Sequence, residues 1–130
     1  MATQPTPVDP PQLHYSPAFA QGMVVPAGPT LYVGGQNGTD SSGTLLDGLE
    51  AQTEQALRNL EAILTAAGAS LSTLVKTTIL YTNVEDFPTI NAIYARHMPD
   101  PAPARSAPAN VVLPHGLLIS IDAIAVIATP

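Results

Sequence analysis

The segment Leu117–Ala128 restricts the fold more than any other feature, because it predicts a β-strand that is apolar on both faces. Alternate side chains of a strand point to opposite faces. The faces carry Ile119, Ile121, Ala123 and Ala125 on one side, and Leu118, Ser120, Asp122, Ile124 and Val126 on the other. One face is expected to pack against helices. The other must meet a second subunit or close a barrel around an interior.

Two helices are predicted along the chain. Leu46–Ala67 places its apolar residues on one stripe with a period near ~3.6, and Gly68 is typical of a helix C-cap. Asp86–Met98 tolerates Pro88 in its first turn and groups Phe87, Asn91 and Tyr94 on one face.

The rest of the regular structure is predicted to be β. A short hairpin is expected at Ala18–Gln21 and Met23–Val25, around Gly22. The other expected strands are Leu31–Gln36, Leu74–Thr82, Arg105–Leu113 and Leu117–Ala128. Inside the first of them, Gly34-Gly35 marks a bulge or a close approach by another group. The order β-β-β-α-β-α-β-β is that of an α+β fold, and two helices cannot cover both faces of such a sheet.

The chain is predicted to form one domain, residues 13–130, preceded by a flexible tail, residues 1–12, that holds four prolines. Only 11% of the residues are charged against 45% hydrophobic, which favours an oligomer that hides apolar surface. A net charge of −6 with four basic residues excludes a phosphate-binding stripe, so neither nucleic acid nor an anionic membrane is an expected partner.

Several other classes of chemistry and location lack sequence support. There is no cysteine, which removes disulfides and thiolate catalysis. Neither a signal peptide nor an apolar run of ~18 residues is present, so the predicted location is the cytoplasm. Nucleotide-loop and hydrolase motifs are missing. His14, His97 and His115 lack metal-site spacing; His97 is expected to be structural and His115 to be solvated.

Arg105 is the principal candidate for ligand binding. Its guanidinium stays charged and offers a planar fork of donors that fits a carboxylate. It precedes the most apolar stretch of the chain, and Asp122 is the only acid after Asp100. Two interpretations remain open: Arg105 pairs with Asp122 or a neighbouring subunit, or it binds a small carboxylate ligand. Asn91 must be hydrogen-bonded if buried, either to protein or to a ligand.

Several sequence blocks together resemble the RidA (YjgF/YER057c/UK114) family over about residues 16–128. They include Pro103-Ala104-Arg105-Ser106, Leu113-Pro114-His115-Gly116, Ile119-Ser120-Ile121-Asp122-Ala123, Val33-Gly34-Gly35-Gln36 and Phe87-Pro88-Thr89-Ile90-Asn91. The resemblance implies a chorismate-mutase-like α+β fold, with a mixed sheet, two helices on one face and a homotrimer around a barrel-like core. It implies hydrolysis of reactive imines or enamines to 2-keto acids and ammonia, without a metal or organic cofactor.

The resemblance also assigns site residues and shows where this chain departs from the family. The family's carboxylate-binding arginine falls on Arg105, and Asn91 keeps a polar pocket position. Ser120 stands where the deaminases usually carry a water-handling glutamate. Ala107 replaces a pocket cysteine, Gly34 a serine and Phe19 a tyrosine. The expected partner is a small imine, enamine or keto acid bearing a carboxylate.

Two functions therefore stay open from sequence. One is an imine or enamine deaminase of a divergent branch, with Arg105 and Ser120 as catalytic residues and water held by positioning rather than by a base. The alternative is a trimeric carboxylate-binding paralogue with little or no hydrolysis. An endoribonuclease activity, also attributed to this family, conflicts with the acidic charge.

Overall fold

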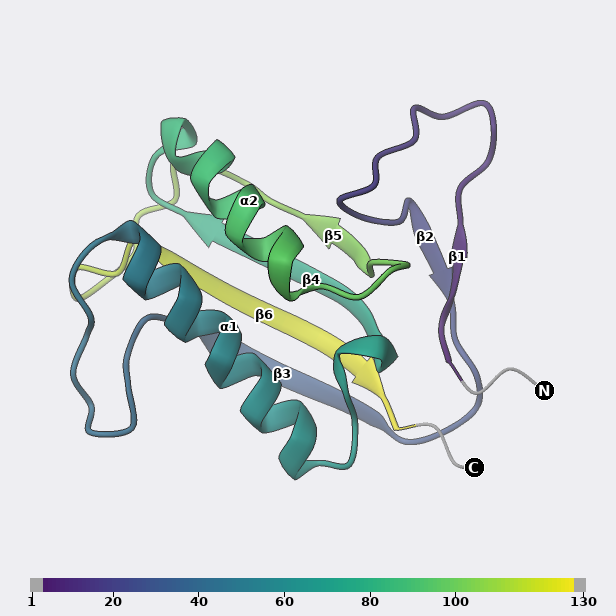
Figure 1. Cartoon of the computed structure of the whole chain (residues 1–130), viewed down its shortest axis with the longest axis horizontal. Helices are drawn as coiled ribbons and strands as arrows, with labels where there is room; N and C mark the ends of the chain where they lie inside the picture. The colour runs from purple at the N-terminus through teal and green to yellow at the C-terminus, as the bar shows by residue number, and fades with distance from the viewer. Residues whose placement is uncertain (1–3, 128–130) are drawn as a thin grey trace.

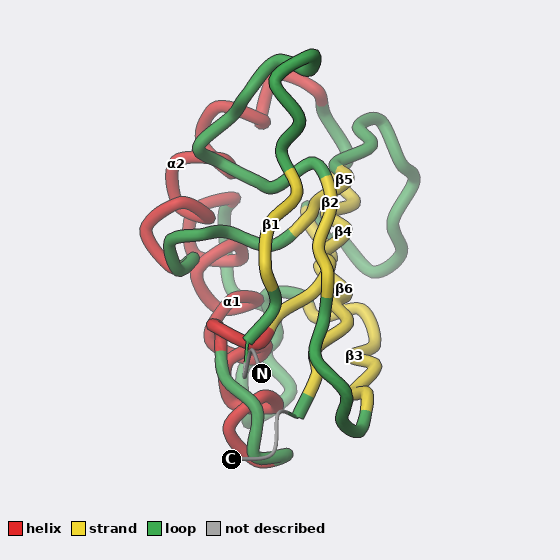
Figure 2. Tube along the Cα trace, turned by 90° about the vertical axis from the view of Figure 1, so that its right-hand side faces the viewer, coloured by secondary structure: helices red, strands yellow, loops and turns green. Residues whose placement is uncertain are grey.

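A computed structural model describes residues 4–127 of the chain. Its main sheet has the order β3-β6-β4-β5, formed by Thr30–Gln36, Ile119–Val126, Leu74–Tyr81 and Ala104–Ser106. β6 runs antiparallel to β3 and β4, whereas β5 is parallel to β4. Both helices, α1 (Leu49–Ala66) and α2 (Phe87–His97), lie on one face of this sheet (Figures 1 and 2). The mixed sheet with two helices on one face confirms the predicted α+β class.

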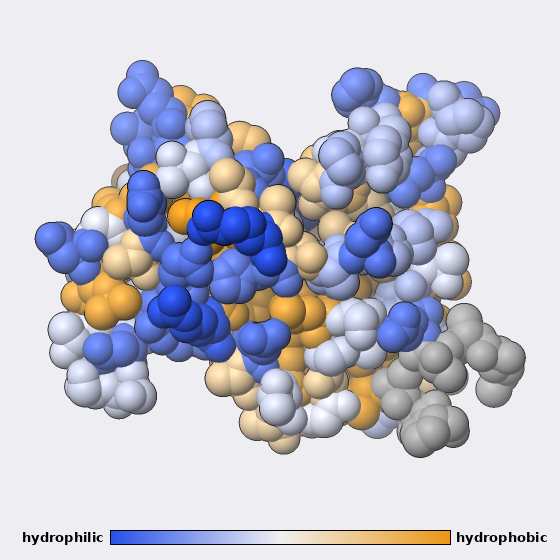
Figure 3. All heavy atoms as spheres, viewed as in Figure 1, coloured by the Kyte–Doolittle hydropathy of each residue, from blue (hydrophilic) through white to orange (hydrophobic). Residues whose placement is uncertain are grey.

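The hydrophobic core lies between the helices and the sheet. Ile119, Ile121, Ala123 and Ala125 of β6 share one face, as the alternation predicts, and this is the face that points inward, where all four are buried. The helices meet them with Leu57, Leu60, Leu64, Ile90 and Tyr94. Burying an aliphatic side chain of this size contributes ~1.5–3 kcal/mol, so this layer provides most of the fold's stability. Hydrophilic residues cover much of the outward surface of the helices (Figure 3).

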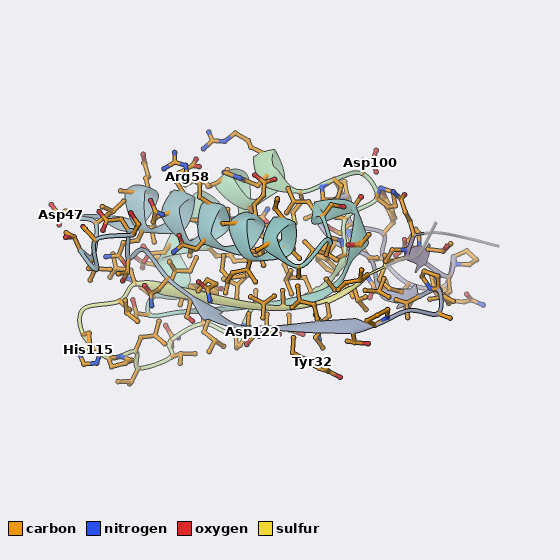
Figure 4. The ribbon with its side chains drawn as sticks, turned by 90° about the horizontal axis from the view of Figure 1, so that it is seen from below. Tyr32, Asp47, Arg58, Asp100, His115 and Asp122 are labelled. Carbon is orange, nitrogen blue, oxygen red and sulfur yellow. The ribbon has the colours of Figure 1, made fainter. Side chains whose placement is uncertain are left out.

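The opposite face of the sheet carries no helix in the part of the chain that the structure describes. Across β4 and β6 it presents the pairs Lys76–Ile124, Thr78–Asp122 and Leu80–Ser120. Tyr32 of β3 is 75% exposed there, and Figure 4 shows Tyr32 and Asp122 pointing away from the helices. We call this surface, defined by Tyr32, Leu80, Ser120, Asp122 and Ile124, the open face.

The N-terminal region differs from its prediction. β1 (Thr6–Val8) pairs antiparallel with β2 (Gly22–Val24), so the hairpin expected around Gly22 is wrong. One residue is too short for the loop of a hairpin, for which two residues is the usual minimum. Ala20 instead bridges to Ala104 at the sheet edge. Part of the expected tail is therefore a strand, while residues 1–3 of that tail lie outside the described residues.

The strand expected at Arg105–Leu113 is also wrong in extent, because β5 ends at Ser106. Pro108 lacks the N–H needed to continue a ladder, and Asn110 adopts a left-handed φ of 60°. A loop follows, and its Val111 N–H donates to the Tyr81 carbonyl. The bulge predicted in β3 is confirmed by a register shift between Val33 and Gln36.

Two short 3-10 helices and one surface ion cluster complete the framework. Leu71–Thr73 leads into β4, and Val84–Asp86 leads into α2. Glu54 of α1 accepts from Arg96 at 2.7 Å and lies 2.6 Å from His97 Nε2, which ties the two helices together. His97 thus has the structural role predicted for it. None of the described helices has the length and apolar character needed to cross a membrane.

Candidate functional site

Arg105 sits at the junction of α2 with the sheet. In the parallel register of β5 and β4 it lies opposite Thr77, which is fully buried on the helix side. Its Nη1 donates to Asn91 Oδ1 at 2.7 Å. Asn91 belongs to the face of α2 that also holds Tyr94, three residues further on. Asn91 is partly buried, and its side-chain oxygen accepts this hydrogen bond within the chain; a contact between Asn91 and a ligand stays a prediction.

Three aromatic rings surround the guanidinium. Its Cζ lies 5.0 Å from the ring centroid of Phe19, 5.5 Å from that of Phe87 and 5.0 Å from that of Tyr94. Each distance is within the range of a cation–π contact. Tyr94 is fully buried, and its hydroxyl is 2.7 Å from Thr77 Oγ1. The cation is thus held by cation–π contacts and by one hydrogen bond to a neutral amide oxygen rather than by a carboxylate.

The electrostatics of Arg105 favour an anionic ligand. Burial lowers the pKa of Arg105 from its ordinary value, while Tyr94 and Tyr81 act in the opposite direction, yet an arginine keeps its charge at any physiological pH. Within residues 4–127 no carboxylate forms a salt bridge with it. No buried side-chain nitrogen or oxygen in this range lacks a partner, so the Arg105 nitrogens not bonded to Asn91 reach the surface.

A pocket of about 540 Å³ opens beside the guanidinium. Its lining is Phe19, Tyr81, Val84, Phe87, Pro88, Arg105 and Ala107. Arg105 is the only charged group among these seven residues, and neither an acid nor a histidine is among them. Such a cavity, with apolar walls and one charged anchor, is typical of a small-molecule site. Burial also raises the pKa of Tyr94 behind the guanidinium, so that phenol stays neutral.

Ser120 and Gly34 lie elsewhere. Ser120 pairs with Leu80 and belongs to the open face, whereas Arg105 points to the helix side of the same sheet. A Cβ built on Gly35 would lie 2.6 Å from Ser120 Oγ, so the absence of a side chain at Gly35 lets the Ser120 hydroxyl occupy this position. Gly34, beside it, has no heavy atom within 4 Å of such a Cβ. Within one chain, the predicted residues therefore form two clusters on opposite faces.

The remaining predicted candidates are placed as follows. Asp122 lies on the open face opposite Thr78 and forms no salt bridge with Arg105, so the intrachain pairing considered from sequence is wrong. His115 is exposed in a turn with a φ of 59°, and His14 is exposed as well. Ala107 and Phe19 both line the Arg105 pocket, as the resemblance implies.

Sequence reasoning did not single out Tyr94, Phe87, Tyr81 or Thr77 as functional residues. The signal for two of them was present, since Phe87, Asn91 and Tyr94 share one face of the predicted helix. An apolar helix face is read as core, however, and only the position of Arg105 under α2 shows that this face also borders a pocket.

The chain is similar in sequence to known proteins. The sequence model of the family described as Endoribonuclease L-PSP matches residues 9–127. A rat protein named 2-iminobutanoate/2-iminopropanoate deaminase is 44% identical over 111 residues, which cover 84% of this chain and 80% of the relative. The human protein of the same name is 42% identical over 110 residues, which cover 83% of this chain and 79% of the human protein. The chain belongs to the RidA (YjgF/YER057c/UK114) family.

Solved structures agree with this assignment. RidA from an Antarctic Psychrobacter bacterium superposes with a TM-score of 0.73 at 36% identity, over 82% of this chain and 86% of the other. A Rid-family protein of unknown function from Yersinia pestis superposes with a TM-score of 0.78 at 29% identity, over 95% of this chain and 98% of the other. Relatives include a mitochondrial protein of Schizosaccharomyces pombe and a chloroplastic one of Arabidopsis thaliana, so cytoplasmic location stays a prediction.

Proposed function

We propose that the protein hydrolyses 2-imino acids, and larger enamine carboxylates, to 2-keto acids and ammonia. The observation that carries this proposal is the Arg105 guanidinium, which is bonded to Asn91, lies against aromatic rings and lines an otherwise uncharged, largely apolar pocket. The names of the rat and human relatives, at 44% and 42% identity, support the same reaction. Arg105 is proposed to bind the substrate carboxylate in a bidentate manner.

Hydrolysis then requires only water and three proton transfers. Water adds to the C=N carbon of the protonated imine and loses a proton, which gives a neutral carbinolamine. The nitrogen then gains a proton and the hydroxyl loses one as the C–N bond breaks, which releases the keto acid and ammonia, with one proton released overall. A protonated imine is already a good electrophile, so a held carboxylate and a positioned water supply much of the catalysis. Ser120 is proposed to hold this water through its hydroxyl.

The opposite faces of Arg105 and Ser120 have a consequence for assembly. If both act on one substrate, Ser120 must come from a neighbouring subunit, whose open face covers the Arg105 pocket. We therefore propose a homotrimer with the chorismate-mutase-like arrangement, a barrel-like core and a site at each interface. Sedimentation should give three times the 13.4 kDa chain mass at micromolar concentration. A stable monomer would remove both the interface and the composite site.

The pocket walls set the expected substrate range. Phe19, Val84, Phe87, Pro88 and Ala107 are apolar and offer no group to bind a polar side chain. Each buried methylene contributes ~0.8 kcal/mol. Imines derived from amino acids with apolar side chains larger than methyl should therefore be hydrolysed with higher kcat/KM than 2-iminopropanoate.

The competing function is a trimeric carboxylate-binding paralogue with little or no hydrolysis. It is favoured by Ser120, because a serine hydroxyl is not a base at neutral pH, and by a pocket lining that lacks an acid or histidine. In that case Arg105 would bind keto acids in the same way, and only the rate of water addition would differ.

One experiment separates the two functions. An amino acid oxidase generates imines from L-alanine or L-leucine in the presence of semicarbazide, which traps whatever has not been hydrolysed. A deaminase lowers the semicarbazone yield in proportion to its concentration. An unchanged yield, together with binding of 2-oxobutanoate measured by calorimetry, would establish the binding paralogue instead.

A further inference from the structure

The support behind Arg105 is a closed set of contacts drawn from three elements. Arg105 of β5 lies opposite Thr77 of β4, and the Thr77 hydroxyl is 2.7 Å from the Tyr94 hydroxyl of α2. The Tyr94 ring returns to the guanidinium at 5.0 Å. Thr77 and Tyr94 are both fully buried, and neither lines the pocket.

Tyr94 differs from the other two rings around the cation. Phe19 and Phe87 border the pocket and have no polar atom that could fix their orientation. Tyr94 lies behind the guanidinium, and its hydroxyl is joined to the sheet. A buried hydroxyl pair of this kind restrains the ring, because both groups would lose a hydrogen bond if the ring moved.

We propose that Tyr94 and Thr77 are positioning residues of the site: their hydrogen bond fixes the ring against which the Arg105 guanidinium rests, so that its free donors face the pocket. The proposal rests on the carboxylate-binding role proposed for Arg105 but not on hydrolysis. Asn91 fixes Nη1 from the same helix, one turn earlier. The Tyr94 ring and the Asn91 amide together hold the guanidinium in a single orientation. A bidentate contact with a carboxylate requires such a fixed orientation.

The test compares Tyr94→Phe with the double variant Thr77→Val/Tyr94→Phe. The single variant keeps the ring, removes its hydroxyl and leaves the Thr77 hydroxyl unpaired, whereas the double variant removes both partners. Replacing both members of a buried pair is nearly neutral for stability. We expect the melting temperature to fall in the single variant and to recover in the double variant. Dissociation constants for 2-oxobutanoate should rise about three- to tenfold in both, which is the range of one hydrogen bond.

Kinetic and spectroscopic readouts sharpen the test. KM for 2-imino acids should rise by the same factor while kcat changes less than twofold. The reason is that Arg105 would bind the substrate carboxylate equally well in the ground state and in the transition state. The chain has three arginines, so its Nε–H spectrum is simple and Arg105→Lys assigns the Arg105 signal. The order parameter of that Nε–H should fall in both Tyr94 variants.

A matched control separates positioning from mere stability. Thr53 is also fully buried, and its hydroxyl donates to the Leu49 carbonyl at 2.7 Å, away from the pocket. Thr53→Val should lower the melting temperature but leave keto-acid binding and the Arg105 signal unchanged. If binding recovers together with stability in the double variant, the pair is only structural. If 2-oxobutanoate does not bind the unmodified protein, carboxylate binding by Arg105 and the positioning role of Thr77 and Tyr94 are both refuted, whatever the hydrolysis assay shows.

Discussion

The Arg105 pocket and the open face are built from the same sheet but differ in completeness. On the helix side, one chain supplies the cation, its aromatic support, its hydrogen-bond acceptor and an apolar cavity. On the other side, Ser120, Asp122 and Tyr32 remain partly or largely exposed, with no helix over them in the described chain. With the roles proposed above for Arg105 and Ser120, substrate binding would be a property of the subunit, whereas water handling would depend on the proposed assembly.

The largest effect is expected from removing the cation of the Arg105 pocket. Arg105→Ala deletes a charged, bidentate donor, and each charge-assisted bond contributes ~1.5–3 kcal/mol. We expect binding of 2-oxobutanoate to weaken by at least about tenfold, and kcat/KM for imino acids to fall by the same factor or more. Calorimetry and the semicarbazide assay measure the two effects.

The proposed trimer should survive this change, because the role proposed for Arg105 is to bind a ligand and not a group of the neighbouring subunit. Arg58→Ala is the matched control, since Arg58 is exposed on α1. A dissociated Arg105→Ala variant, or equal losses in the two variants, would assign Arg105 to an interface rather than to a ligand.

The second prediction concerns the open face. Ser120→Glu introduces an acid where the family's deaminases carry one, and general-base catalysis typically contributes ~10²–10⁴-fold. We expect turnover of 2-iminopropanoate to rise about ten- to a hundredfold, the low end of that contribution. KM should rise as well, because the new carboxylate competes with the substrate for Arg105 across the proposed interface.

Asp122 is the acid that could activate water in place of a glutamate at position 120. It shares the open face with Ser120, but residues two apart on a strand lie ~7 Å from each other. If the unmodified protein already turns over small imines rapidly and Ser120→Glu leaves the rate unchanged, water activation uses Asp122 or another group. The variant Asp122→Asn would then lower the rate.

These two clusters also show what sequence could and could not predict. The alternation in Leu117–Ala128 correctly predicted which side chains of β6 share a face, because a strand has a two-residue period, but it did not say which face meets the helices. The Gly34-Gly35 bulge and both helices were predicted for similar local reasons. The pairing of Thr6–Val8 with Gly22–Val24 was not, since a partner so distant in sequence leaves no local signal.

The sequence named candidate residues for the site but not their arrangement. Family motifs named Arg105, Asn91, Phe19, Ala107, Gly34 and Ser120 without saying which of them share a face. The β4–β5 and β4–β6 registers separate Arg105 from Ser120, because a strand residue's face depends on its register, and register is a tertiary property. The aromatic support of Arg105 was missed because Tyr94 satisfies every criterion of an ordinary core residue.

A smaller effect is expected from the two glycines of the β3 bulge. Gly35→Ala would place a Cβ 2.6 Å from Ser120 Oγ and push that hydroxyl aside, while Arg105 on the other face is untouched. We expect kcat to fall a few-fold, with keto-acid binding unchanged. Gly34→Ala is the control for stability of the chain, because its Cβ meets no heavy atom within 4 Å. Equal binding losses in Gly35→Ala and Arg105→Ala would contradict the separation of the two clusters.

The smallest expected effect lies outside both clusters and tests whether the framework between the helices matters. The hydrogen bond from His97 holds the pKa of Glu54 below its ordinary value of 4.5, with Arg96 adding to the effect. A lowered carboxyl pKa stabilises the fold above pH 4.5, and this stability is lost as the pH falls through the lowered value. Glu54→Gln should therefore reduce the free energy of unfolding by less than ~1 kcal/mol at pH 7, because exposed ion pairs contribute little. The difference from the unmodified protein should vanish in acid, as urea titrations at pH 7 and pH 3 would measure. Keto-acid binding should not change at pH 7, because Glu54 does not line the Arg105 pocket.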